Sequence, residues 1–171
     1  MPMTGRSRLW LTVAVLLAPL SPALAQSTGE FSMVLSSTYN TTSLKHEGTV
    51  FTAGSLQGSA TVTSGSGSLF QQGENFLRSC IVSSERSEDG LNLRSHCTLT
   101  EAGEDGGDQV WMSVYRNQGD PIGVAQDGRG RTEFVGGTGK YTGITGHCAY
   151  DVQYLIPSLG VLMADCNWSK P

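Results

Sequence analysis

The glycine-rich segment FVGGTGKYTGITGHC, residues 134–148, contains the residue types of a phosphate-binding loop. A P-loop requires a serine or threonine directly after its lysine, because that hydroxyl binds magnesium, but Tyr141 follows Lys140. A dinucleotide-binding turn requires the spacing G-x-G-x-x-G, and Gly143 lies one residue too far from Gly139. The segment therefore predicts neither a nucleotide site nor a cofactor.

Four cysteines could bind a metal or form disulfides: Cys80, Cys97, Cys148 and Cys166. Structural zinc sites usually contain two cysteines separated by two to four residues, and this spacing is absent from the sequence. An even number of cysteines is typical of disulfides when a chain enters an oxidising compartment. The cysteines therefore predict two disulfides and no metal site.

The histidines and acids of the sequence do not indicate a further metal-binding or catalytic site. His96 and His147 each directly precede a cysteine, which in a strand places the imidazole on the face opposite the sulfur. We therefore expect both histidines to point outward. The acids of EAGEDGGDQ, residues 101–109, lack the spacing of a calcium-binding EF-hand and are typical of a solvated hairpin tip.

The first 25 residues are typical of a secretory signal. Two arginines precede an apolar run that two prolines interrupt, and the run ends in the small-x-small pattern Ala23-Leu24-Ala25. An uncleaved membrane anchor is the alternative, but the run is shorter than the roughly 20 residues that span a bilayer. The sequence predicts cleavage before Gln26, a single domain over 26–171 without a membrane span, and a secreted or periplasmic location.

The charge of the mature domain argues against nucleic acid and anionic membranes as partners. Without the two arginines of the signal, nine basic residues face fifteen acidic ones, which leaves a net charge of −6. The basic residues are scattered singly, whereas phosphate-rich partners require clustered lysine and arginine.

Short runs of alternating apolar and polar residues dominate the mature chain, and this period of two is typical of half-buried strands. Turn residues separate the runs. They cover residues 30–37, 48–63, 75–83, 91–99, 108–116, 129–137, 146–155 and 161–169. The pattern predicts an all-β fold, an antiparallel β-barrel of about eight strands or a sandwich, and we expect the barrel.

Hairpin geometry predicts how the cysteines pair. Residues opposite each other across a hairpin have numbers with a constant sum, and a turn centred on Glu88-Asp89 gives 177, which is also the sum of 80 and 97. A turn centred on Pro157 gives 314, the sum of 148 and 166. Opposed residues lie close enough for a disulfide, so we predict Cys80–Cys97 and Cys148–Cys166.

The same registers predict which residues face the core. Tyr150, Tyr154 and Trp168 share the face of the second disulfide, and Arg78 shares the face of Cys80. Because an unpaired buried charge is costly, Arg78 should pair with an acid, line a wet cavity or reach a rim. A bulge that shifts the register is the alternative.

The glycine-rich segment resembles the Gly-Gly-Thr-Gly-Lys-aromatic-x-Gly-x-x-Gly segment of the allene oxide cyclase-like and dirigent-like barrels. The matching glycines are Gly136, Gly137, Gly139, Gly143 and Gly146. The resemblance implies a small eight-stranded antiparallel barrel, often exported, with a central hydrophobic cavity in which members cyclise or orient reactive intermediates. It carries over no catalytic residue.

Glycines at these positions would let a barrel strand bend sharply. We expect Gly136-Gly137 to end one strand, Gly143 and Gly146 to lie where the next strand bends, and Tyr141 to cover one of these last two.

We expect the barrel to bind a small hydrophobic or aromatic molecule. Tyr150, Tyr154 and Trp168 would supply ring surface and Arg78 an anchor for a carboxylate, unless the aromatic side chains only fill the core. The alternatives are a cyclase-like or dirigent-like enzyme, for which Glu133 is the acid to watch, and a structural envelope protein with a filled barrel. An enclosed cavity on the order of several hundred Å³ favours binding or catalysis, and a solid core favours the structural role.

Overall fold

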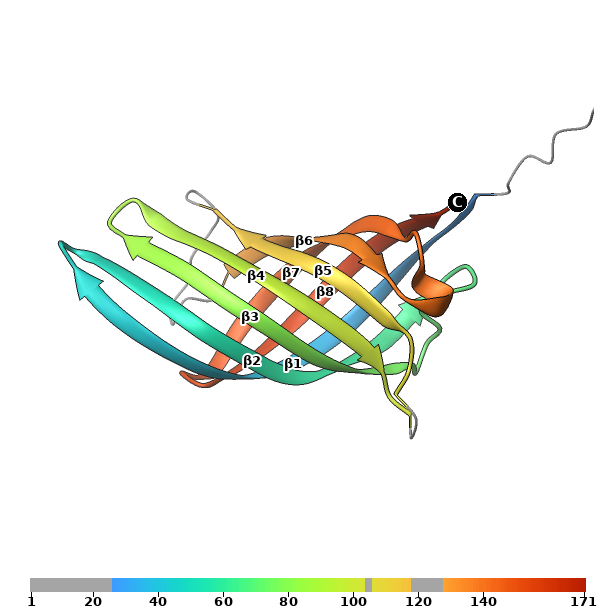
Figure 1. Cartoon of the computed structure of the whole chain (residues 1–171), viewed down its shortest axis with the longest axis horizontal. Coiled ribbons are helices and arrows are strands. Elements are labelled where there is room, and N and C mark those ends of the chain that lie inside the picture. Colours follow the sequence, from blue (N-terminus) through green and yellow to red (C-terminus); the bar gives the residue numbers. More distant parts are fainter. Residues whose placement is uncertain (1–25, 104–105, 118–127) are drawn as a thin grey trace, which may run out of the picture.

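The computed structural model describes residues 26–103, 106–117 and 128–171, which form a closed barrel of eight strands. The strands are β1 (Ser27–His46), β2 (Thr49–Gly65), β3 (Asn75–Ser87), β4 (Gly90–Glu101), β5 (Gln109–Arg116), β6 (Gly128–Gly137), β7 (Thr145–Ile156) and β8 (Leu159–Lys170). Each strand pairs antiparallel with the next in chain order, and β8 pairs with β1 to close the barrel (Figure 1). The predicted fold class is confirmed.

The predicted signal peptide, residues 1–25, lies outside the described residues. The described residues contain no helix of the length and apolarity needed to cross a membrane.

Both predicted disulfides are present. Cys80 lies opposite Cys97 on β3 and β4, with 4.1 Å between their Cα atoms. Cys148 lies opposite Cys166 on β7 and β8, with 4.0 Å between the Cα atoms. All four sulfurs face the interior, so each disulfide ties two neighbouring strands together from inside the barrel.

The alternating pattern places one face of every strand in the core. In β8 the even-numbered residues from Leu162 to Trp168 are buried, whereas the odd-numbered residues from Met163 to Asn167 are exposed. His96 and His147 are exposed, as predicted, and point out of the barrel. A barrel of eight strands is narrow enough for inward side chains to fill it, and the buried apolar residues form one continuous cluster.

Aromatic rings fill one end of the barrel, where β1 begins, β8 ends and the short helix η2 (Gly139–Tyr141) lies (Figure 1). Phe70 and Tyr141 are fully buried, and their ring centroids are 5.2 Å apart. The Phe31 ring stacks on Phe70 with 3.9 Å between centroids, and Phe76 and Phe134 complete the group. We call these five residues the aromatic plug.

An ionic cluster, which we call the latch, holds η2 against the plug end. The Lys140 ammonium pairs with Glu101 and, at 3.3 Å, with Glu74. The Lys140 backbone N–H donates to Asp108 at 2.8 Å, and the Tyr141 hydroxyl donates to Glu101 at 2.9 Å. The prediction of a solvated hairpin tip is therefore wrong for Glu101 and Asp108, because both carboxylates bind η2.

The glycine-rich segment forms the connection from β6 through η2 into β7, and β6 ends at Gly137 as predicted. Gly139 and Gly143 have φ angles of 48° and 76°, in the left-handed region that favours glycine. The expected position of Tyr141 is wrong, because a Cβ built at Gly137 would lie 2.6 Å from the Tyr141 Cβ, whereas Gly143 and Gly146 have other neighbours.

The opposite end of the barrel is built differently. The β1–β2 and β3–β4 hairpins project beyond the turn that joins β7 to β8 at the same end (Figure 1). Among the described residues this end is hollow, and we call it the cup end.

Candidate ligand-binding site

One hollow at the cup end has a volume of about 440 Å³, and we call it the cup. Apolar and aromatic side chains make up much of its wall, and hydroxyl groups of β1, β2 and β3 supply the rest. The apolar and aromatic residues are Tyr39, Val82, Leu93, Tyr154, Leu155 and Ile156, with Pro157 at the turn. A second hollow of about 650 Å³ lies between the projecting hairpins and includes Leu44, Phe51 and Arg116.

A smaller cavity of about 30 Å³ lies deeper in the barrel. Its wall contains Arg78, Arg116, Ser95 and Tyr150 together with aliphatic side chains. Tyr39, Val82, Leu93 and Tyr154 line both this deep cavity and the cup, so they form the boundary between the two spaces.

The two boundary tyrosines contact each other. The ring centroids of Tyr39 and Tyr154 are 5.5 Å apart, with 49° between the ring planes. Burial raises the pKa of the Tyr39 hydroxyl, and the neighbouring Tyr154 raises it further. Tyr39 is therefore neutral near pH 7 and supplies an aromatic face and a hydroxyl rather than a charge.

Arg78 is the central polar group of the deep cavity. Its side chain is inside the barrel, the whole residue is only 5% exposed, and the register of β3 with both neighbours is continuous around it. Of the sequence-based alternatives, the bulge is wrong, and Arg78 faces the barrel interior and lines the deep cavity. Burial lowers the pKa of Arg78 and nearby tyrosines oppose this shift, but a guanidinium stays protonated in proteins.

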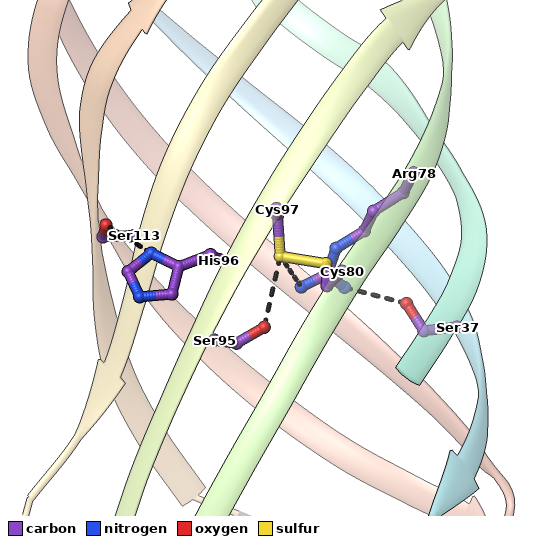
Figure 2. Close-up of a disulfide and its surroundings, with 7 residues drawn as sticks. All are labelled: Ser37, Arg78, Cys80, Ser95, His96, Cys97 and Ser113. Carbon is purple, nitrogen blue, oxygen red and sulfur yellow. Dashed lines mark hydrogen bonds between the residues drawn. A yellow bond between two sulfur atoms is a disulfide. The ribbon is translucent and has the colours of Figure 1, made fainter. Parts of the chain in front are cut away.

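Figure 2 shows the contacts of the Arg78 guanidinium with Ser37 and with the Cys97 sulfur. One Nη donates to Ser37 Oγ on β1 at 2.8 Å, and the other lies 3.7 Å from Cys97 Sγ. The Nε is buried and has no hydrogen-bond partner among the described residues. No carboxylate of the described residues is bonded to it.

Arg78 reaches past one strand, β2, to bond Ser37 on β1, and Gly58 is the β2 residue between them. Gly58 lies on β2 between Ser37 of β1 and Arg78 of β3, and it pairs with both. A Cβ at this position would collide with the Ser36 carbonyl oxygen and the β1 backbone. The close approach of the β1 backbone therefore leaves no room for a side chain at position 58.

The structure brings together three of the four residues predicted to bind a ligand. Arg78, Tyr150 and Tyr154 line the deep cavity, and the Tyr150 hydroxyl donates to the Tyr115 carbonyl oxygen at 3.4 Å. Trp168 is buried at the plug end and lines neither space, because Gly29 and Gly67 pack against its indole. Glu133 is exposed on the outer surface of β6.

Sequence reasoning missed Tyr39 and Arg116. Arg116 has the same inward parity as Val110, Met112 and Val114, so the alternation of β5 already contained the signal. Tyr39 was missed because the expected first strand ended at residue 37, whereas β1 continues to His46 and the alternation of its burial extends to Tyr39.

The described residues that line the deep cavity supply cationic and hydroxyl groups but no acid or thiol. All four cysteines are in disulfides. Within the described ranges, no group of three or more histidines, cysteines and acids is arranged to hold a metal ion. The chemistry that these residues offer is hydrogen-bond donation and charge stabilisation.

No known protein-family model matches this chain, and a comparison with curated proteins finds no match.

Proposed function

We propose that this protein binds a small hydrophobic or aromatic molecule in the cup and that it works in the periplasm or outside the cell. The supporting observation is a hollow of about 440 Å³ with aromatic and aliphatic walls in a barrel held by two disulfides. This volume is within the usual range for small-molecule sites. Disulfides are typical of proteins in oxidising compartments.

In this proposal the ligand lies mainly at the cup end, and not in a central cavity as the sequence led us to expect. The enclosed space around Arg78 measures only about 30 Å³, so the apolar body of a ligand would lie in the cup rather than at the barrel centre. Of the two earlier alternatives, the structural envelope role has a specific observation in its favour, since side chains fill the plug half. A cyclase-like or dirigent-like role has no comparable observation in its favour, since the described residues that line the deep cavity include no acid.

The neutral fluorophore N-phenyl-1-naphthylamine tests the binding role. We expect saturable binding, with a loss of about tenfold in Leu93→Gln, because Leu93 lines the cup. Leu77→Gln is the matched control, since Leu77 lies on the same hairpin but is 62% exposed on the outside. Absence of saturable binding, or equal losses in the two variants, would rule out the cup as the site. Native mass spectrometry of the protein from its own host would then identify any co-purifying ligand.

A further inference from the structure

We propose that the ligand of the cup is an organic acid, with an apolar or aromatic body in the cup and a carboxylate in the deep cavity bound to Arg78. This inference rests on the binding function proposed above and adds the chemical class of the ligand.

The first observation is the spare hydrogen-bonding capacity of Arg78. A guanidinium has five N–H donors, and Arg78 uses one strong bond to Ser37 and one weak contact to the Cys97 sulfur. The Nε of the same group is buried without a partner in the described part of the chain. Buried polar groups are nearly always hydrogen-bonded, so the unfilled donors point to a group that binds there.

The second observation is the sign of the charge around the deep cavity. Arg78 is a buried cation in its wall, and no acid of the described residues lines that wall. Tyr39 does not compensate this charge, since burial keeps its hydroxyl neutral. A buried cation without an anionic neighbour is costly, and a ligand anion would remove that cost.

The third observation is the size and connection of the two spaces. A volume of about 30 Å³ accommodates one small polar group such as a water molecule or a carboxylate. A planar carboxylate fits the forked donors of arginine, and it is smaller than a tetrahedral phosphate or sulfate. Because Tyr39 and Tyr154 line both spaces, a carboxylate at Arg78 would place the attached body between these rings and in the cup.

A matched pair of probes tests the proposal: 2-naphthoate, which carries a carboxylate, and 2-naphthamide, which is its neutral analogue. Titration calorimetry on the disulfide-intact protein should show naphthoate binding about tenfold more tightly than the amide. Arg78→Met should abolish this preference while amide affinity stays within about threefold. Arg131→Met is the control, because Arg131 is exposed on the outside of β6, and it should keep the preference.

The outcomes separate the two proposals. Equal affinity of the wild type for both probes, or a preference that survives in Arg78→Met, overturns the organic-acid inference and leaves the binding function standing. Binding of neither probe counts against the binding function and removes the inference with it. If Arg78→Met fails to fold, Arg78→Lys takes its place, because lysine keeps the charge but lacks the planar fork. We expect the preference of Arg78→Lys for naphthoate over naphthamide to be about fivefold smaller than that of the wild type. An unchanged preference overturns the inference.

Discussion

The plug end and the deep cavity treat positive charge in opposite ways. At the plug end, Lys140 is only partly buried, yet Glu74 and Glu101 both pair with it. In the deep cavity, Arg78 is almost completely buried and has one hydroxyl and one sulfur as partners. The latch is thus a compensated structural element. Arg78 occupies a position that stability alone does not explain.

This difference in charge compensation matches the division of the barrel into a plug half that side chains fill and a cup half that is hollow. The latch holds η2, and η2 places the Tyr141 ring in the aromatic plug. At the cup end the tyrosines contact each other across the boundary of two spaces. We therefore expect the plug end to dominate the free energy of unfolding and the cup end to dominate binding.

The largest expected effect comes from truncating one tyrosine at each end. Tyr141→Ala should lower the free energy of unfolding by about 3–5 kcal/mol, because it removes a fully buried ring from the plug. Tyr154→Ala should lower it by only about 1 kcal/mol, since Tyr154 is half-buried at the cup. Denaturant unfolding followed by tryptophan fluorescence measures both values. Similar losses at the two ends would contradict the division into a filled and a hollow half.

Removing charge from the deep cavity and from the latch should change stability in opposite directions. Arg78→Met replaces an uncompensated buried charge with an apolar side chain of similar length, so we expect the ligand-free protein to gain about 1 kcal/mol or more. Glu101→Gln weakens the bonds from Lys140 and Tyr141, so we expect a loss of about 1–2 kcal/mol. Chemical denaturation of both variants at pH 7 provides the comparison. A large loss in Arg78→Met would assign Arg78 a structural role instead.

The smallest expected effect is a pH dependence at the latch. Burial lowers the pKa of Lys140, but hydrogen bonds and charges from Glu101 and Glu74 more than offset this, so the net shift is upward. A raised pKa in the folded state means that the stabilisation is fully present below the ordinary lysine pKa and is lost as the pH rises through the folded value. Wild-type stability should therefore fall more steeply than that of Lys140→Met above about pH 10. The measurement is the free energy of unfolding of both proteins at several pH values between neutral and alkaline. Equal changes in the two proteins would contradict this coupling.

Much of the fold could be predicted because its determinants are local. Alternation with a period of two identifies strands and their inward faces, and it placed Arg78 and Tyr150 inside the barrel. The symmetry of two hairpins identified both disulfides, since opposed residues depend only on where the turn lies. Even Arg116 could have been assigned inward from the pattern of β5.

The latch could not be predicted from such patterns. Lys140 is separated from Glu74 by 66 residues and from Glu101 by 39, and no local pattern connects them. In the sequence, the acids around Glu101 are typical of a solvated hairpin tip. Only the structure shows that η2 lies beside them.

The sequence by itself determined the barrel, its disulfides and the inward direction of Arg78, Tyr150, Tyr154 and Trp168. Only the tertiary structure decided that the first three surround one cavity while Trp168 lies at the other end. It also decided that Lys140 has acidic partners and that Arg78 has none in the described part of the chain. The physical reason is that alternation specifies the face of a strand but not its height in the barrel. Strand tilt and stagger around the closed sheet set that height, and they depend on all eight strands together.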